Sequence, residues 1–316
     1  MFKDGRTNTV DEPRSGRPSD SMNEETVAIV SAILEEDRQQ TIRQIEQQIA
    51  AEYAYVQVSL GSIHSIIHDH LQMTKVSARW VPRELTADHM RDRMGAALEF
   101  LSRYHEYGEA FLDQIVTGDE CWVHFYTPES KRSSMTWKTK DEPTPKKFKV
   151  VPSAGAVMLT FFWDREGPLL IEFLPTQKVK GKRRTVTQDT YFDTMIRLRQ
   201  AIKAKRRGKL SQKICLLHDN ARPHTARLIA LLLNDFKWFT FPHPPCSPDL
   251  APSDFHAFPG LTEWLGGQRF EDEESCKAAV TAFFEKQGRE WYDAGIVKLI
   301  HRYEKYLARS GDYVEK

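Results

Sequence analysis

Apolar residues recur three or four positions apart in three stretches near the start of the chain, which is the spacing of one helix face. The three sets are Val27, Val30, Ile33 and Leu34, then Ile42, Ile45 and Ile49, then Leu60, Ile63, Ile67 and Leu71. Thr41 and Gln44 have the spacing of a capping box, which predicts the start of the second helix, and the third helix is expected from Ser59 to Leu71. Three short helices with a turn before the third are typical of a helix-turn-helix, whose last helix enters the DNA major groove. A three-helix bundle without a role in DNA binding fits these residues equally well.

The helical spacing is interrupted at Trp80-Val81-Pro82-Arg83-Glu84-Leu85 and resumes in residues 86 to 112. The inward positions expected there are Met90, Met94, Leu98, Leu101 and Phe111. We interpret residues 77 to 112 as a connector that leads into a second domain.

The rest of the chain changes to strand-like runs that are followed by helices. Strands are expected at residues 115–126, 157–163, 169–174 and 214–217, and helices at 191–205, 223–233, 254–265, 273–287 and 291–308. This order predicts a mixed α/β layer domain. A polar insert with seven Lys or Arg, residues 127 to 152, separates the first two strands. A loop that long in a compact domain is usually functional or disordered.

Composition narrows the class of protein. The 316 residues are 40% hydrophobic and 28% charged, which excludes a fibre, a disordered tail and a minimal disulfide scaffold. The formal net charge is only +1, but residues 178 to 213 hold thirteen Lys or Arg against two acids. Residues 21 to 60 hold two Arg against seven acids. The middle of the chain therefore predicts a basic surface.

Cysteine usage and hydropathy indicate the compartment. The four cysteines, Cys121, Cys215, Cys246 and Cys276, are far apart and form no C-x-x-C pair, so neither a disulfide framework nor a zinc module is expected. No apolar run approaches the roughly 18 residues that span a bilayer, and the N-terminus is polar. We expect an intracellular protein.

Three acids stand beside apolar runs. Asp119 lies inside the first predicted strand, Asp219 directly follows the fourth, and Asp254 stands at the start of a helix. A carboxylate in such a place is costly unless it is solvated, hydrogen-bonded or neutralised by a cation, which favours a shared metal site. Taken singly, Asp219 is also typical of a turn, and Asp254 of an ordinary helix N-terminus.

The spacing and the surrounding motifs decide between these interpretations. Asp219 and Asp254 are separated by 34 residues. The motifs are Arg14-Ser15-Gly16-Arg17-Pro18, Trp80 to Leu85, Thr117-Gly118-Asp119-Glu120, His218-Asp219-Asn220-Ala221-Arg222-Pro223-His224, Cys246-Ser247-Pro248-Asp249-Leu250-Ala251-Pro252-Ser253-Asp254, and the ending Gly311 to Lys316. With them the chain resembles the transposases of the mariner elements, in the Tc1/mariner superfamily, from about Phe2 to Lys316.

The resemblance implies an RNase-H-like catalytic domain preceded by an all-α helix-turn-helix domain. Asp119, Asp219 and Asp254 would hold two Mg²⁺ or Mn²⁺ ions, which prefer hard oxygen ligands and cut phosphodiesters when they lie roughly 3.5–4 Å apart. In the family this centre hydrolyses DNA at the element's terminal inverted repeats, and the freed 3′-hydroxyl attacks a TA target. A nuclear homodimer acting on double-stranded DNA is expected.

The resemblance also implies DNA contacts and a dimer contact. Arg14 and Arg17 would follow the minor groove, as Arg in Gly- and Pro-rich arms does. The other DNA-binding residues expected are Ser59, Ser62, His64, Lys75, Lys182, Arg183 and Arg184, and the dimer linker expected is Trp80, Val81, Pro82, Arg83, Glu84 and Leu85. The implied domains are a first helix-turn-helix remnant with its linker (1–22), a second helix-turn-helix (23–76), a linker (77–112) and a catalytic domain (113–316) with a clamp loop (127–152).

Three features depart from the family pattern. Residues 1 to 6 resemble only the end of a first helix-turn-helix, Cys246 stands where the family usually has Tyr, and residues 177 to 188 are longer and more basic than usual. The first departure leaves an alternative function, a transposition-defective or domesticated DNA-binding protein or nuclease remnant. The chain also resembles the transposase part of a primate methyltransferase–transposase fusion, but we expect no methyltransferase activity from it.

Overall fold

A computed structural model describes residues 23–77, 81–131, 133–146, 148, 150–174 and 185–314. The chain divides into two compact units, Met1–Trp80 and Val81–Lys316. The predictions made for Arg14, Arg17, Trp80 and residues 182–184 lie outside the described residues. None of the described helices combines the length and apolar character that crossing a membrane requires.

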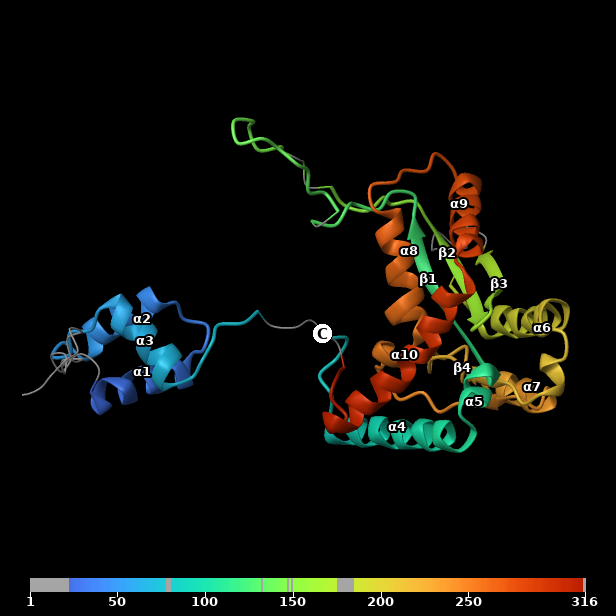
Figure 1. Ribbon diagram of the computed structural model, residues 1–316, viewed down its shortest axis with the longest axis horizontal. Helices are drawn as coiled ribbons and strands as arrows, with labels where there is room; N and C mark the ends of the chain where they lie inside the picture. The colour runs from blue at the N-terminus through green and yellow to red at the C-terminus, as the bar shows by residue number, and fades with distance from the viewer. Residues whose placement is uncertain are drawn as a thin grey trace, which may run out of the picture. The chain divides into compact units, whose positions relative to one another are not determined.

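The first unit contains the three predicted helices (Figure 1). They are α1 (Glu24–Glu36), α2 (Ile42–Glu52) and α3 (Leu60–Ser65), which continues as the π-turn η3 (Ile66–His70). Thr41 caps α2 through the predicted capping box with Gln44. The apolar faces meet in one core, whose buried members include Val30, Ile45 and Ile63.

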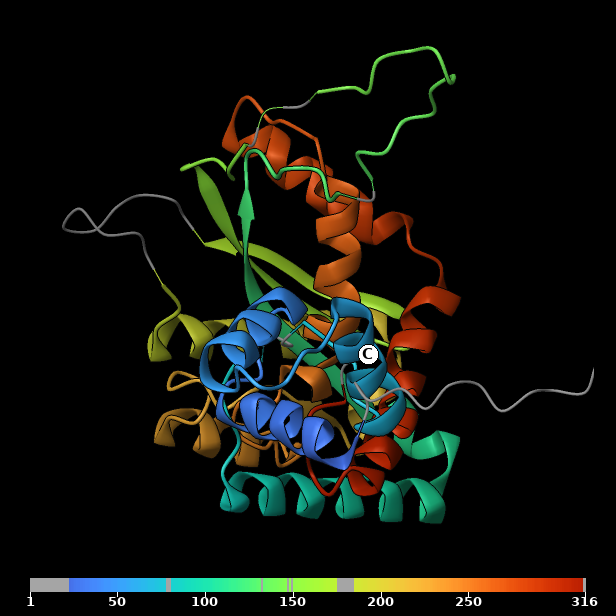
Figure 2. The ribbon, with the colours of Figure 1, turned by 90° about the vertical axis from the view of Figure 1, so that its left-hand side faces the viewer.

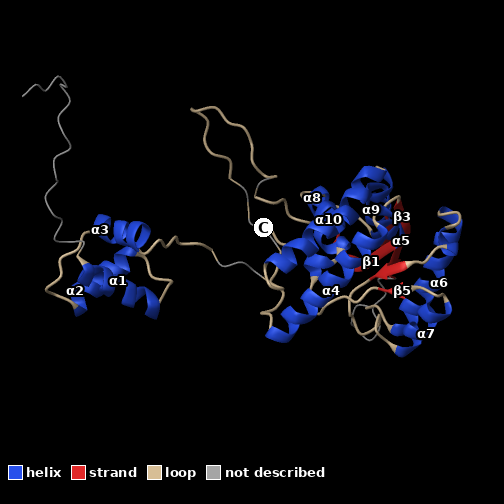
Figure 3. Cartoon of the chain, turned by 60° about the horizontal axis from the view of Figure 1, so that its bottom comes forward, coloured by secondary structure: helices blue, strands red, loops and turns tan. Residues whose placement is uncertain are grey.

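A five-stranded sheet forms the centre of the described part of the second unit (Figure 3). The strands are β1 (Ile115–His124), β2 (Ala156–Asp164), β3 (Gly167–Leu174), β4 (Cys215–Leu217) and β5 (Phe239–Thr240), in the spatial order β3-β2-β1-β4-β5. β1, β2 and β3 pair antiparallel, whereas β4 pairs parallel with both β1 and β5. The sequence missed β5, because two residues are too few to show a strand pattern.

Helices cover both faces of this sheet. They are α4 (Ala87–Tyr107), α5 (Glu109–Gln114), α6 (Gln188–Lys205), η4 (Lys209–Ser211), α7 (Arg227–Asp235), η5 (Pro248–Leu250), η6 (Ser253–Ala257), α8 (Phe258–Leu265), α9 (Glu273–Lys286) and α10 (Arg289–Ala308). Side chains alternate between the two faces of a strand. Ile115 and Cys215 accordingly join the core with α4, α8, α9 and α10, while Val116 and Leu216 join the core with α6 and α7.

The structure confirms Leu101 and Phe111 as inward positions and leaves Met90 and Met94 half-buried, but it contradicts the prediction for Leu98. Leu98 is 56% exposed, whereas Arg93 is completely buried and Phe100 nearly so. The reason is tertiary, because partners from distant segments accept the Arg93 guanidinium. α4 and α5 also contribute to the main core of the second unit, so most of residues 87 to 112 of the predicted connector packs as part of that unit.

The insert between β1 and β2 has no regular structure in its described residues. Figures 1 and 2 show it as a long loop that projects from the second unit. Bridges from Tyr126 to Arg269 and from Thr127 to Gly266 fix its first residues beside the end of α8. Several apolar side chains farther along are exposed, among them Trp137 and Phe148.

Candidate active site

The topology of the sheet brings the three predicted acids into one region. Thr117 of β1 pairs with Leu217 of β4, and Asp119 and Asp219 each stand two residues beyond that pair. Because β1 and β4 run parallel, the two acids lie at the same level of neighbouring strands. Asp254 belongs to η6, which contacts β1. Each acid therefore comes from a separate element around the end of β4.

The charges of Asp254 and Asp219 act on Asp119. Burial raises the pKa of Asp119, and the negative charges of Asp254 and Asp219 raise it further, to about 8. Burial also acts to raise the pKa of Asp219, but hydrogen bonds from His224 and the backbone N–H of Ala221 outweigh it and hold that pKa below its ordinary value. The region concentrates negative charge that a cation would neutralise.

The donor chemistry of this region fits divalent cations that prefer oxygen. Three carboxylates from three elements are available, and the buried Oε1 of Glu120 has no hydrogen-bond partner. Mg²⁺ and Mn²⁺ bind such hard ligands. Among the described residues, no group of three or more His, Cys, Asp or Glu side chains is placed so that it could hold a metal ion without moving. The fit therefore rests on the donor set and its charge.

Sequence reasoning missed a histidine that supports Asp219. His224 donates from Nδ1 to Oδ1 of Asp219 at 2.6 Å, and its Nε2 lies 3.2 Å from Oε2 of Glu120. Burial alone would lower the pKa of His224, but these two carboxylates raise it to about 10. The motif from His218 to His224 carries the signal, because its final residue is a histidine five positions after Asp219.

A buried arginine anchors the loop that leads to Asp254. Sequence reasoning missed this residue as well. Arg93 donates to Oδ2 of Asp249 at 3.0 Å and to Oγ of Ser247 at 2.7 Å. Both side chains of the Arg93–Asp249 ion pair are completely buried. The Arg93 guanidinium also lies over the rings of Tyr306 and Tyr313, 4.1 and 4.5 Å from their centroids. This network explains why Ser247 and Asp249 belong to the motif that ends at Asp254.

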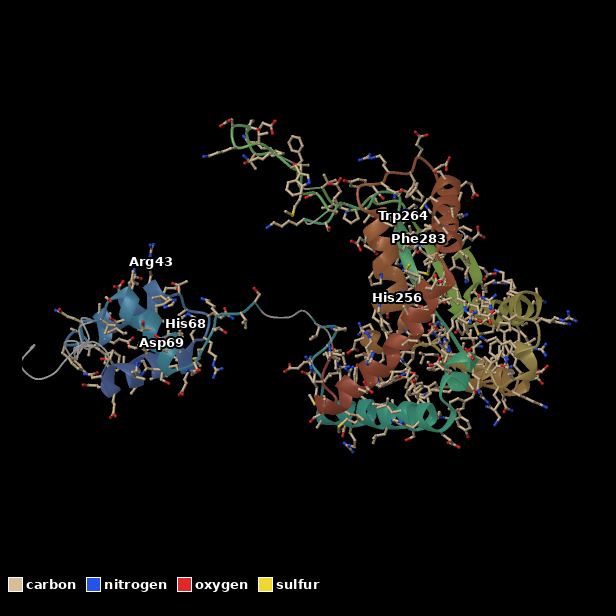
Figure 4. The ribbon with its side chains drawn as sticks, in the orientation of Figure 1. Arg43, His68, Asp69, His256, Trp264 and Phe283 are labelled. Atoms are coloured by element: carbon tan, nitrogen blue, oxygen red, sulfur yellow. The ribbon has the colours of Figure 1, made fainter. Side chains whose placement is uncertain are left out.

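An aromatic layer fixes the other side of η6 (Figure 4). Nε2 of His256 donates to the carbonyl oxygen of Trp291 at 2.8 Å. The rings of Trp264 and Phe283 lie 5.1 Å apart. Gly295 allows this packing, because a Cβ there would lie 2.5 Å from the His256 ring. Asp254 is thus carried on a turn that is held from both ends.

A groove of about 520 Å³ opens beside Asp254. Pro128, Ser130 and Ser133 from the base of the insert form one part of its lining, and Phe258 and Thr262 from α8 form another. The insert and the third acid therefore share one surface.

The described cations of the basic stretch, residues 178 to 213, are of two kinds. Some form ion pairs within the fold, and others lie on an exposed surface. Arg206 and Lys209 both pair with the buried Asp164, and Arg197 pairs with Glu172. A second groove, of about 630 Å³ between α6 and α7, is lined by the exposed cations Arg199, Lys203 and Arg207. These three are the side chains of the described stretch that are best placed for a polyanion.

The residues expected to bind DNA in the first unit have identifiable local contacts. Oγ of Ser59 caps α3 by accepting the N–H of Ser62 at 3.0 Å. The exposed His64 ring lies 4.2 Å from that of His68, which precedes Asp69 at the end of η3 (Figure 4). Nζ of Lys75 donates to the carbonyl oxygens of Gln39 and Gln40, at 2.8 Å each. Lys75 therefore ties the turn before α2 as well as presenting a charge, and the DNA contacts remain predictions.

The described part of the predicted dimer linker, Val81 to Leu85, is exposed except for Leu85, which is half-buried. Its backbone is tethered at one point, where Tyr313 donates its hydroxyl to the carbonyl oxygen of Arg83 at 3.0 Å. The role of this segment in a dimer stays a prediction.

Comparison with known proteins gives concordant results. A family model described as transposase (partial DDE domain) matches residues 127–212. The chain is 34% identical to the Mariner Mos1 transposase of Drosophila mauritiana, over 99% of this chain and 85% of the relative. It is also 34% identical to the human histone-lysine N-methyltransferase SETMAR, of which it spans only 43%.

Solved structures agree with the sequence comparisons. The mariner Mos1 paired end complex with Mg matches with a TM-score of 0.78 at 33% identity, covering 99% of this chain and 86% of that one. The complex with Mn matches with a TM-score of 0.77 at the same identity and coverage. These likenesses confirm the family and the fold class that the sequence predicted.

Proposed function

Because this chain belongs to the mariner family of DNA transposases, we propose that it cleaves DNA at the ends of a mobile element and joins those ends to a TA target. Cleavage is a hydrolysis, in which water attacks a phosphodiester phosphorus and leaves a 3′-hydroxyl and a 5′-phosphate. Joining is a transesterification, in which that 3′-hydroxyl attacks a target phosphodiester and releases a target 3′-oxygen that takes up a proton. Neither step needs a covalent protein–DNA intermediate.

The proposal rests mainly on the positions of Asp119 and Asp219, which stand two residues beyond the paired Thr117 and Leu217 of two parallel strands. Besides burial, the charge of Asp254 also raises the pKa of Asp119. We assign Asp119, Asp219 and Asp254 as ligands of two divalent ions, Mg²⁺ or Mn²⁺. Such ions, when bound, lower the pKa of water and stabilise the leaving oxygen. The three carboxylates would hold these ions beside the reacting phosphate, with Asp119 binding in its ionised form.

Other surfaces of the chain support binding to double-stranded DNA. The groove with Arg199, Lys203 and Arg207 offers phosphate contacts that do not depend on sequence. We assign α3 as the helix that reads the terminal inverted repeat, and the insert and linker as contacts within a homodimer. We propose that the protein acts in the nucleus, where its DNA substrate lies. The methyltransferase activity named for SETMAR is not proposed for this chain.

The test incubates the purified full chain with supercoiled plasmid, with and without Mg²⁺ or Mn²⁺. Wild type is expected to nick the plasmid only with metal. Asp219→Asn should abolish nicking and leave DNA affinity nearly intact, because it removes a ligand charge without changing the basic surface. Asp235→Asn, which alters an exposed acid of α7, is the matched control and should nick like wild type. DNA binding without metal-dependent nicking by wild type would identify a binding remnant instead.

A further inference from the structure

His224 links the carboxylates of Glu120, which belongs to β1, and Asp219, which follows β4. Along β1, Asp119 shares a face with Val123, and Glu120 belongs to the opposite face with Val116, because side chains alternate. The imidazole is only 2% exposed and contacts Glu120 through Nε2 and Asp219 through Nδ1. One ring therefore connects β1 to the segment that follows β4.

The ring is held in a fixed position by aromatic neighbours. Its centroid lies 4.0 Å from that of Tyr191, and it stacks on His218 with centroids 5.3 Å apart and planes 10° from parallel. The Tyr191 hydroxyl lies 2.7 Å from Nδ1 of His218, so the supporting rings are themselves hydrogen-bonded. A side chain confined in this way fixes the direction of its own hydrogen bonds.

The contacts to Asp219 leave one of its oxygens for another use. Nδ1 of His224 and the backbone N–H of Ala221 both donate to Oδ1, at 2.6 and 3.0 Å. Neither contact engages Oδ2. Holding Oδ1 from two directions fixes the plane of the carboxylate, and with it the position of Oδ2.

We propose that His224, braced by Glu120, is a positioning residue that orients Asp219 so that Oδ2 binds a divalent cation. This inference rests on the proposed function, since it assigns Asp219 as a metal ligand. Residues that orient metal ligands through hydrogen bonds typically contribute about 10- to 100-fold to metal affinity or activity. The contribution comes through Nδ1, the atom that contacts the ligand.

Two substitutions of His224 distinguish the contact made by Nδ1 from the contact made by Nε2. The amide nitrogen of Asn takes the place of Nδ1, and that of Gln takes the place of Nε2. His224→Asn therefore keeps the contact to Asp219, and His224→Gln keeps the contact to Glu120. Both remove the stacking on Tyr191. A packing role alone would make both variants equally defective, whereas a positioning role separates them.

The primary measurement is the Mn²⁺ dissociation constant of the full-length protein, followed by the electron paramagnetic resonance of free Mn²⁺. We expect His224→Gln to weaken binding by about 10- to 100-fold and His224→Asn by less than tenfold. His301→Gln, at a histidine that is 79% exposed on α10, is the control and should bind like wild type. Tryptophan fluorescence melts verify that each variant is folded.

The outcomes distinguish the inference from the function on which it rests. Equal Mn²⁺ affinities for His224→Asn and His224→Gln, whether both normal or both reduced, would overturn the positioning role, as would a wild-type protein that binds no Mn²⁺. Plasmid nicking is measured on the same preparations. A wild type that binds Mn²⁺ with the expected variant pattern but never nicks DNA would refute the proposed function and leave the positioning of Asp219 established.

Discussion

Replacing Arg93 by Met should destabilise the second unit strongly, although Arg93 is distant in sequence from the three acids. The substitution keeps an unbranched side chain of similar length but removes the charge and every hydrogen-bond donor. Asp249 would then remain completely buried, with the N–H of Val314 as a hydrogen-bond donor at 3.1 Å. Ser247 and the carbonyl oxygen of Gly311 would each lose a donor.

The size of the expected loss of stability follows from the complete burial of the Arg93–Asp249 ion pair. Removing one partner of a buried ion pair costs about 3–5 kcal/mol, because the other charge stays buried without compensation. For a unit of this size, each kcal/mol lowers the melting temperature by about 2–4 °C, so a fall of roughly 6–20 °C is expected. Because the Arg93–Asp249 pair anchors the loop leading to Asp254, nicking should be lost at lower temperatures as well.

Intrinsic fluorescence provides the assay, since every tryptophan beyond Trp80 belongs to the second unit. Urea titrations of wild type and Arg93→Met give the free energies of unfolding. Arg91→Met is the matched control, because Arg91 lies on the same helix with a 70% exposed side chain and should change stability by less than about 0.5 kcal/mol. A loss below about 1 kcal/mol for Arg93→Met would refute the reasoning from burial.

Two further predictions concern single positions. Burial acts to raise the pKa of Asp164, but ion pairs with Arg206 and Lys209 outweigh it and lower that pKa. The ionised Asp164 therefore stabilises the fold above its unfolded pKa of about 3.9, and this stabilisation is lost as the pH falls through the folded pKa. Asp164→Asn should therefore cost about 3–5 kcal/mol at pH 7 in urea titrations, and a difference from wild type that does not shrink near pH 3 would contradict this. Gly118→Ala should lower the free energy of unfolding by about 1–3 kcal/mol and reduce nicking, because the alanine Cβ would lie 2.2 Å from the Phe162 ring. An unchanged melting temperature would show that the Phe162 side chain moves aside without cost.

Local patterns predicted most of the elements because their causes are local. The Thr41–Gln44 capping box begins α2 in the structure as the sequence predicts. The spacing of apolar residues likewise indicated α6, α9 and α10, since amphipathic helices need only one apolar face. Local patterns also suggest Asp119, Asp219 and Asp254 as candidate metal ligands, because two of them stand beside apolar strands and all three lie within recognisable motifs.

Features that depend on distant partners could not be predicted in this way. Arginine is almost never fully buried unless it is paired, and only the fold brings Asp249, Tyr306 and Tyr313 around Arg93. The bridge from Glu120 to His224 requires the pairing of β1 with β4, which no local pattern specifies. The strand order β3-β2-β1-β4-β5 is itself a long-range property.

Metal binding by the three acids can be measured by Mn²⁺ titration of the separate Asp119→Asn, Asp219→Asn and Asp254→Asn variants. The electron paramagnetic resonance of free Mn²⁺ should show tight binding by wild type and by the Asp235→Asn control. Each variant of the three acids should lose most of that affinity, because each removes one hard oxygen ligand and its charge. Wild-type affinity in all three variants would contradict the account.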